Sequence, residues 1–260
     1  MAVSAPPARR MVVSDVHGHL DVLRERLAAH GLLHRDSWAG GDRHLWFLGD
    51  YVDRGPEGLG VVELVRRLEA GARASGGRVT PLLGNHELQF LAARHFGERP
   101  VRPGSDVSWL SGWRRYGGVD EELRLVSDDQ VDWMTRLPLV DEEDGVLLLH
   151  SDTDAYLELG RSVAEINAAG HRILTGRDPV EWAFLHQLMT RRGDFLNAER
   201  AAAFLHALGG HRVVHGHSPL GGVFRLEKSA RTRPHVYADG RATAIDGGVF
   251  EGGALIVAEL

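Results

Sequence analysis

The sequence of 260 residues contains no cysteine. This absence excludes disulfides, thiolate nucleophiles and thiolate metal ligands together. A metal site in this chain must therefore use histidine, aspartate, glutamate and asparagine as its ligands. The absence of cysteine does not decide the redox compartment.

Long apolar runs are missing as well. No stretch approaches the roughly 20 consecutive apolar residues that a membrane helix needs. The amino-terminal segment MAVSAPPARRM also lacks the apolar centre of a signal peptide. These absences favour a soluble cytoplasmic protein that has no membrane partner.

Runs of basic residues are absent too. The 30 Lys and Arg residues are scattered through predicted helices and the formal net charge is −6, so we expect no binding to nucleic-acid polymers. A hydrophobic content of 43% supports a packed core. Because no Pro/Ser/Gly-rich linker or abrupt change of charge divides the chain, we expect a single domain over residues 1–260.

Five short apolar runs predict buried β-strands, because each is bounded by Gly, Asp or Asn and has the length of one strand. These runs are Met11–Ser14, His44–Leu48, Val79–Leu83, Val146–Leu149 and Arg212–Val214. Helical spacing of apolar residues follows the first three runs, at Leu20–His30, Leu59–Gly71 and Glu87–Phe96. The first third of the chain therefore alternates strand and helix, as α/β proteins do.

The remainder of the chain has a different pattern. Between residues 100 and 138 an aromatic and charged segment predicts short helices and no strand, and we interpret it as a small insertion or cap. Further helices are predicted at Glu158–Gly170, Pro179–Arg191 and Ala198–Leu208. Three more strand-like runs suggest a second sheet, at His235–Ala238, Ala242–Ile245 and Ala254–Val257.

Polar side chains follow the predicted strands at the points where the strands end. Asp15 and His17 follow the first strand, and the alternation of an extended chain sends both side chains to the same side. Because open α/β sheets place their sites at one edge, we expect the polar groups at successive strand ends to meet. These groups are Asp15, His17, Asp50, Asp53, Arg54, Asn85, His86, Glu87, His150, His215 and His217.

The ordered motifs resemble those of a known family. They are Asp-x-His at 15–17, Gly-Asp-x-x-Asp-Arg-Gly at 49–55, Gly-Asn-His-Glu at 84–87, a lone His150, and Gly-His at 216–217. The set is similar to that of the calcineurin-like metallophosphoesterases, in particular the bacterial phosphoprotein phosphatase (Ser/Thr protein phosphatase-like) branch. The segment Ile245-Asp246-Gly247-Gly248 is a weaker likeness, where relatives often carry Asp-Thr-Gly.

The resemblance implies a fold and a metal centre. The fold would be a central two-sheet β-sandwich flanked by helices, an α/β/β/α arrangement, with the small helical insertion added. Two divalent metal ions would bind, the first at Asp15 and His17 and the second at Asn85, His150 and His217, with Asp50 between both. We expect Mn²⁺, although ligands of mixed oxygen and nitrogen also accept Fe, Zn, Co or Ni.

Two positions near the carboxyl-terminal motif need separate interpretation. The ligating position of the family follows the glycine, which makes His217 the ligand and His215 a secondary candidate. Some relatives carry a second histidine two residues further on, whose place is taken here by Pro219. The first metal ion should therefore be open to water on that side.

The implied reaction is the hydrolysis of phosphate monoesters by a hydroxide that the two metal ions share. Arg54 and Asn85 would bind the phosphate, since the planar guanidinium suits two phosphate oxygens. His86 would protonate the leaving group as a general acid, with Asp53 fixing the orientation of its ring. We interpret Glu87 as a residue that opens the following helix.

Some positions leave alternatives open. Asp152 and Asp154 follow His150 and either change the substrate preference or cap the next helix, and we favour capping. The second phosphate-binding arginine is Arg177, Arg191 or Arg192. In the segment 100–138, Trp109, Trp113 and Tyr116 either pack in the core or, together with Arg114 and Arg115, bind a nucleobase or phosphopeptide, and we favour packing.

Three functions are compatible with the motifs. The first is a Ser/Thr protein phosphatase or broad phosphomonoesterase, whose partner is a phosphorylated protein, peptide or small phosphoester. The second is a dinucleoside polyphosphate hydrolase similar to the diadenosine tetraphosphatases. The third is a catalytically silent metal-binding scaffold, which we regard as least in keeping with the complete set of ligand positions.

Overall fold

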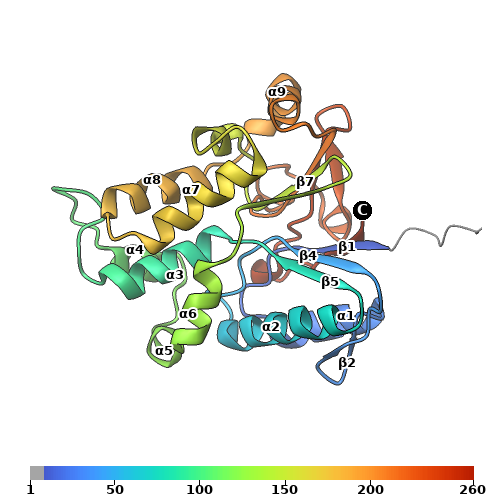
Figure 1. Ribbon diagram of the computed structural model, residues 1–260, viewed down its shortest axis with the longest axis horizontal. Helices are drawn as coiled ribbons and strands as arrows, with labels where there is room; N and C mark the ends of the chain where they lie inside the picture. The colour runs from blue at the N-terminus through green and yellow to red at the C-terminus, as the bar shows by residue number, and fades with distance from the viewer. Residues whose placement is uncertain (1–8) are drawn as a thin grey trace, which may run out of the picture.

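A computed structural model describes residues 9–260 of the chain as two β-sheets packed face to face between layers of helices (Figure 1). Most of the amino-terminal segment expected to lack a signal peptide lies outside the described residues. Within them, no helix combines the length and the apolar character needed to span a bilayer.

The first sheet has the strand order β11-β1-β4-β5. Its parallel strands are β1 (Arg10–Val13), β4 (His44–Phe47) and β5 (Arg78–Pro81), and β11 (Val257–Glu259) pairs antiparallel with β1. The second sheet has the order β6-β7-β8-β10-β9. Its strands are β6 (Val140–Glu143), β7 (Val146–Leu149), β8 (Arg212–His215), β10 (Ala242–Ala244) and β9 (His235–Tyr237).

Helices cover the outer sides of the two sheets. Figure 1 shows α1 (Leu20–Ala29) and α2 (Gly58–Ala74) on one side of the molecule, next to the first sheet. On the other side, beyond β7, lie α7 (Val163–Thr175), α8 (Pro179–Met189) and α9 (Ala198–Leu208). The expected α/β/β/α arrangement is therefore confirmed. The small hairpin of β2 (Leu33–His34) and β3 (Ser37–Trp38) was not predicted.

The alternation of side chains along the strands creates two separate cores. Val12, Trp46, Leu148 and Val214 come from both sheets and form one buried cluster between them. Their neighbours along the strands point the other way and pack against the helices in a larger cluster. The indole N–H of Trp46 donates to Asp141 at 2.7 Å, which ties the first sheet to β6.

Short helices occupy the segment 100–138, as the sequence predicts. These helices are α4 (Trp109–Arg115), α5 (Asp120–Leu125) and α6 (Asp128–Thr135), and they follow α3 (Asn85–Phe96). Ser108 caps α4, and its hydroxyl accepts the N–H of Ser111. Ser127 caps α6, and its hydroxyl accepts the N–H of Gln130. Serine side chains at both starts satisfy N–H groups that the helices leave free.

The positions predicted for two elements were wrong. The helix expected at Glu158–Gly170 is a 3₁₀ turn, Asp154–Glu158, followed by α7, because Ser162 caps a new helix by accepting the N–H of Glu165. The run Ala254–Val257 was expected in the second sheet. The strand is instead Val257–Glu259, and it covers the free edge of β1 in the first sheet.

His186 on α8 makes the stability of this fold depend on pH. Burial lowers the pKa of His186 from 6.5 to about 4. The unfolded chain therefore takes up a proton between these pH values that the folded chain does not, and the free energy of unfolding falls as the pH falls from 6.5 to 4.

We expect His186→Phe to remove about 2 kcal/mol of the stability difference between pH 7.5 and pH 4.5 in urea unfolding. His206→Phe, on the exposed face of α9, is the matched control for the replacement of a histidine by phenylalanine. An unchanged pH dependence in His186→Phe would contradict this account.

Candidate metal centre

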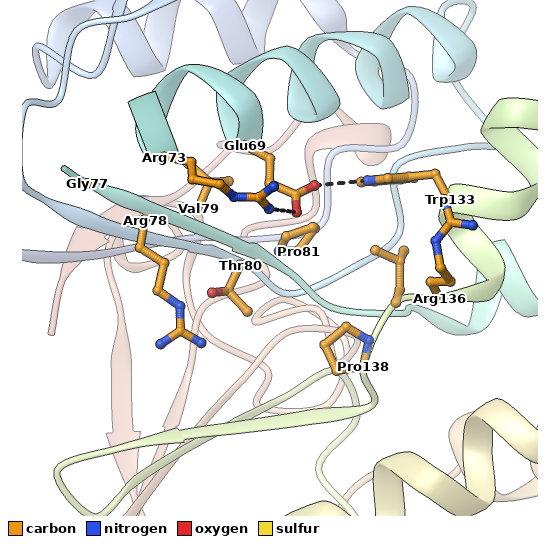
Figure 2. A pocket seen from close by; sticks show the side chains of 11 residues that line it. Glu69, Arg73, Gly77, Arg78, Val79, Thr80, Pro81, Trp133, Arg136 and Pro138 are labelled. Carbon is orange, nitrogen blue, oxygen red and sulfur yellow. Dashed lines mark hydrogen bonds and ion pairs between the residues drawn. The ribbon is translucent and has the colours of Figure 1, made fainter. Parts of the chain in front are cut away.

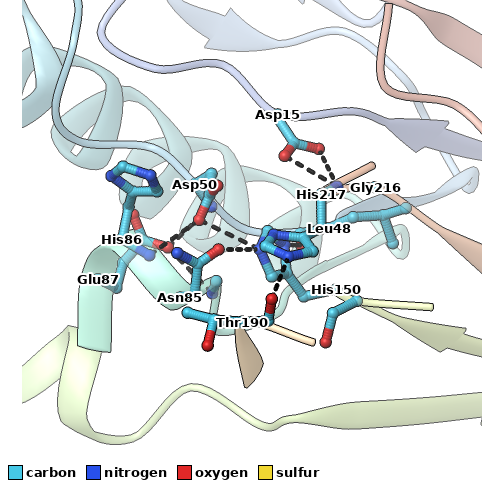
Figure 3. A network of polar contacts seen from close by, with 12 residues as sticks. Asp15, Leu48, Asp50, Asn85, His86, Glu87, His150, Thr190, Gly216 and His217 are labelled. Carbon is cyan, nitrogen blue, oxygen red and sulfur yellow. Dashed lines mark hydrogen bonds and ion pairs between the residues drawn. The ribbon is translucent and has the colours of Figure 1, made fainter. Parts of the chain in front are cut away.

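The candidate ligands lie where strands of both sheets end. Asp15 and His17 follow β1, and Asp50 follows β4. Asn85 and His86 form the first turn of α3, directly after β5. His150 follows β7 and His217 follows β8, so the second sheet supplies ligands to the same place. Figure 3 shows Asp50, Asn85, His150 and His217 next to one another.

The converging side chains form two groups that share one residue. Ligand atoms of His17, Asp50 and His86 all lie within 4.8 Å of one another, and so do those of Asp50, His150 and His217. All five side chains are buried. Because Asp50 belongs to both groups, one carboxylate lies between two places that could each hold a metal ion.

The two oxygens of Asp50 point to different groups. Oδ2 lies 3.4 Å from Nε2 of His17, and Oδ1 lies 3.3 Å from Nε2 of His150. Oδ1 of Asn85 is 2.9 Å from the same nitrogen of His150, which places the amide beside the second group. Asp15 belongs to neither group. Its two oxygens accept the backbone N–H of His217 at 3.1 and 2.9 Å, so it fixes the loop that carries this histidine.

In His17 and His150, the ring nitrogen that faces away from Asp50 lies next to a backbone carbonyl oxygen. Nδ1 of His17 lies 3.2 Å from the carbonyl oxygen of Val52, and Nδ1 of His150 lies 2.7 Å from that of Leu48. With the proton on Nδ1, each ring presents the lone pair of Nε2 to Asp50. Ligating histidines are commonly oriented by such a bond from the other ring nitrogen.

Glu87 holds the loop that carries Asp50. Its carboxylate accepts the backbone N–H groups of Gly84, Asp50, Tyr51 and Val52 at 2.7 to 3.2 Å. Burial and the charge of Asp50 raise the pKa of Glu87 to about 8. The side chain occupies the first turn of α3, as expected, and its bonds go to the backbone.

The backbone around the centre is unusually strained. Within residues 9–260, five of the eleven non-glycine residues with positive φ carry candidate site side chains, and they are His17, Asp50, Asp53, Arg54 and His217. Such conformations persist where the surroundings enforce them, often at functional sites. Glycines make room for the carboxylates. A Cβ on Gly84 would lie 2.2 Å from Oδ1 of Asp50, and one on Gly216 would lie 2.1 Å from Oδ1 of Asp15.

His86 and Asp53 form a buried pair beside the first group. Nδ1–H of His86 donates to Asp53 at 2.8 Å, and the indole N–H of Trp113 donates to the other oxygen of Asp53 at 2.8 Å. Burial by itself would lower the pKa of His86, but the charges of Asp50 and Asp53 raise it above its ordinary value. Arg54 approaches Nε2 of His86 at 3.0 Å, and its guanidinium lies over the ring of Phe250.

Arg192 is the one of the three candidate arginines that reaches the centre. Its Nη2 lies 3.1 Å from Nε2 of His217, and it lines a cavity of about 520 Å³ together with Arg54, His17 and Asp50. The neighbouring Arg191 is paired with acidic residues outside the centre. The sequence alone did not distinguish these arginines, because their partners are brought together only by the fold.

Three candidates from the sequence have other contacts. Nε2 of His215 lies 2.7 Å from the hydroxyl of Tyr237, and His215 belongs to neither ligand group. The preference for Asp152 and Asp154 as helix caps was wrong, because Thr153 accepts the N–H of Ala155 at the start of the 3₁₀ turn. Asp152 instead joins two loops through Gly193 and Ser218, and Asp154 pairs with Arg200.

The charges at the centre suit bound cations. Burial raises the pKa of Asp15, with a further contribution from the carboxylates of Asp246 and Asp50. Burial lowers the pKa values of His17 and His217, so both imidazoles are neutral and offer lone pairs. Neutral imidazoles beside closely spaced carboxylates are the donor set that divalent transition-metal ions bind.

A cavity of about 530 Å³ elsewhere in the fold has a different character (Figure 2). Its lining contains several arginines, no histidine and a single acidic residue, Glu69. This carboxylate pairs with Arg73 at 3.2 Å and accepts the indole N–H of Trp133 at 3.1 Å. The cavity therefore offers no metal-ligand set.

This sandwich, with two ligand groups that share a carboxylate, defines the metallophosphoesterase class of α/β proteins. The chain belongs to the calcineurin-like phosphoesterase family, whose family model matches residues 8–220. This finding confirms the resemblance seen in the motifs.

Two curated relatives show the range of proteins that the chain resembles. The chain is similar to a symmetrical bis(5'-nucleosyl)-tetraphosphatase of Bordetella pertussis, with 32% identity over 153 residues that cover 58% of this chain and 46% of the relative. Shewanella-like protein phosphatase 2 of Arabidopsis thaliana is 35% identical over 86 residues, which cover 33% and 22%. The matches thus span less than half the length of either curated relative.

A solved structure shows the fold. The cold-active protein-tyrosine phosphatase of a psychrophilic Shewanella species superposes with a TM-score of 0.72 at 19% identity, covering 96% of this chain and 75% of that one.

The bond from Trp113 to Asp53 can be tested through stability. We expect Trp113→Phe to lower the free energy of unfolding by about 1–3 kcal/mol in urea at pH 7, because one oxygen of a buried carboxylate loses its donor. Trp38→Phe is the matched control, since its exposed indole N–H donates to the carbonyl of Gly41. A loss for Trp113→Phe no larger than that of the control would contradict the role of this bond.

Proposed function

We propose that this protein hydrolyses phosphate monoesters with the help of two divalent metal ions. The observation that supports the proposal is the carboxylate of Asp50, which lies between two ligand groups in a cavity that Arg54 and Arg192 also line. Two cations beside two guanidinium groups would match the charge of a phosphate ester. The proposal covers a Ser/Thr protein phosphatase as well as a broad phosphomonoesterase.

The proposed ligands divide between the two ions. Asp15, His17 and Asp50 would hold the first ion, and Asp50, Asn85, His150 and His217 would hold the second, whereas His86 would serve as the acid and not as a ligand. We propose Mn²⁺ as the metal. Bound divalent ions would lower the pKa of coordinated water and neutralise charge on the phosphoryl group.

The arginines and Asn85 would position the phosphate. Arg54 and Arg192 both line the cavity of the metal centre, together with His17 and Asp50. A guanidinium can donate two parallel N–H bonds to phosphate oxygens, and such bonds are stronger than those between neutral groups. The oxygen atoms that do not react would therefore be fixed from two directions.

His86 would transfer a proton to the leaving oxygen. Its pKa is raised, and Nδ1–H is already engaged by Asp53 at 2.8 Å, so a second proton would be carried on Nε2. Nε2 lies on the side of Arg54, where the phosphate would bind. Proton donation matters most for an alkoxide, because an alkoxide is a poor leaving group without it.

We further propose that residues 1–260 form one metallophosphoesterase unit with residues 100–138 as a helical insertion. Two contacts support this division. Trp113 of the insertion donates to Asp53, and the carbonyl of Gly117 accepts the backbone N–H of Arg54 at 2.7 Å. The insertion would thus support the acid pair and the phosphate-binding arginine.

A second candidate function is the hydrolysis of dinucleoside polyphosphates. The similarity to a bis(5'-nucleosyl)-tetraphosphatase favours it. Turnover of a phosphoserine peptide, p-nitrophenyl phosphate and diadenosine tetraphosphate by the Mn²⁺-loaded protein separates the candidates. We expect the two monoesters to be hydrolysed. Hydrolysis of the tetraphosphate alone would support the second candidate, and no turnover despite bound metal would indicate a silent scaffold.

Substitutions at Asp50 and His86 should have different effects. We expect Asp50→Asn to lose both bound metal and activity, because both ligand groups lose their shared charge. His86→Asn should retain metal but lose at least about 100-fold in turnover of alkyl phosphates, as expected for a missing general acid. Elemental analysis and steady-state kinetics measure these effects. Equal metal content together with equal activity in the two variants would defeat the assignment.

Neighbouring arginines give a matched test of phosphate binding. Arg192→Lys should raise KM for p-nitrophenyl phosphate by about tenfold, because lysine cannot reproduce a planar pair of donors. The same replacement at Arg191, which pairs with Glu158 and Asp194, should leave KM near the wild-type value. Equal KM values for the two variants would show that Arg192 does not bind the phosphate.

A further inference from the structure

A cavity of about 420 Å³ adjoins the cavity of the metal centre. Both cavities are lined by Pro219 and Glu251, so they share a wall. The lining comes from two segments, residues 219–232 between β8 and β9, and residues 247–254 after β10. A group bound in this cavity would therefore lie beside a phosphate at the metal centre.

The loop that follows β8 is tied to the metal centre by a backbone bond. The N–H of Leu220 donates at 2.8 Å to the carbonyl of Asp246, which lines the cavity of the metal centre. Nε of Arg231 donates at 2.7 Å to the carbonyl of Leu226 in the same loop. A Cβ on Gly221 would lie 2.3 Å from Nη1 of Arg231, so the guanidinium lies against this glycine. These contacts fix Arg231 in the wall of the adjoining cavity.

The same loop is basic in a chain that is acidic as a whole. Residues 225–233 contain four cationic side chains and one acidic residue, whereas the formal net charge of the chain is −6. Within residues 9–260, none of the four cations forms an ion pair with an acidic side chain. They are Arg225, Lys228, Arg231 and Arg233. The loop therefore presents positive charge that the described part of the chain does not neutralise.

Lys228 has a special place in this loop. It is the only lysine in the sequence, since the other 29 of the 30 Lys and Arg residues are arginines. Its side chain is exposed and lines the adjoining cavity together with Arg231. An ammonium group on a flexible stem of four carbons can meet a carboxylate in several positions. A reagent that reacts with the amine of lysine therefore reports on this cavity.

We propose that the adjoining cavity and its basic loop bind acidic side chains of a phosphopeptide, on one side of the phosphorylated residue. The proposal rests on the proposed hydrolysis of phosphate esters. Lys228 and Arg231 outnumber Glu251, the one acidic residue of the lining. The lining contains no aromatic side chain on which a nucleobase could stack. An extended peptide advances about 3.3–3.6 Å per residue, so acids close to the phosphorylated residue would reach the cavity.

Three phosphoserine peptides of equal length test the proposal with the Mn²⁺-loaded protein. The first has alanines on both sides of the phosphoserine, the second has aspartates on the amino-terminal side, and the third has aspartates on the carboxyl-terminal side. We expect kcat/KM for one acidic peptide to be about fivefold higher than for the alanine peptide, and for the other acidic peptide to stay near it. Added salt should reduce the preference, because exposed charges are screened.

Replacement of the lysine tests the cavity itself. Lys228→Gln should reduce the ratio of kcat/KM between the favoured acidic peptide and the alanine peptide by about threefold. Arg136→Gln is the matched control and should keep the wild-type ratio. Arg136 is also an exposed cation without an acidic partner among the described residues, but it lines the separate cavity of Figure 2. The proposal is overturned if aspartates give no gain, if they give equal gains on both sides, or if Lys228→Gln keeps the ratio.

Carbodiimide cross-linking gives a second readout that needs no turnover. The peptide is the favoured acidic one, acetylated at its amino terminus and with a phosphonate that cannot be hydrolysed in place of the phosphate. We expect one of its aspartates to be coupled to the amine of Lys228, as mapped by mass spectrometry. Coupling to the terminal amine of the protein alone would overturn the proposal.

The failure of the proposed function would be visible separately. It would appear as the absence of metal-dependent hydrolysis of p-nitrophenyl phosphate and of all three peptides, while the cross-link to Lys228 would still form. Normal hydrolysis with no preference for an acidic peptide and no cross-link to Lys228 would refute the binding of acidic side chains and leave the proposed function intact.

Discussion

The carboxylate of Asp50 has to remain charged at a place from which water is almost excluded. Burial would raise its pKa, but nearby histidines, among them His86, whose own pKa is raised, hold it below the ordinary value. This balance requires side chains from both sheets to meet at one point, and the loop of Asp50 is fixed there by the backbone bonds of Glu87. Closely spaced buried carboxylates are costly without a compensating cation, so the same constraint that shapes the loops also favours metal binding.

The segment 100–138 belongs to this arrangement through two bonds. One joins Trp113 to Asp53 and the other joins Gly117 to the backbone of Arg54. Through them, the segment 100–138 lies against the residues that would protonate the leaving group and bind the phosphate.

Much of the fold and of the candidate site could be predicted from the sequence. Asp50, His150 and the other polar residues directly follow buried apolar runs, and the ends of parallel strands meet in space. The sequence could not indicate which arginine reaches the centre, because Arg191 and Arg192 differ only in the partners that folding gives them. Trp113 packs in the core as predicted, but only the folded chain places its N–H against Asp53. The sequence also did not indicate that Val257–Glu259 pairs with the free edge of β1, because this pairing depends on the tertiary structure.

The shared carboxylate is tested most directly by anomalous diffraction from crystals grown with Mn²⁺, with data collected at the manganese absorption edge. The account predicts two anomalous peaks, one on each side of Asp50, with His17 beside one and His150 and His217 beside the other. A single peak, or peaks that do not include Asp50 among their neighbours, would contradict it.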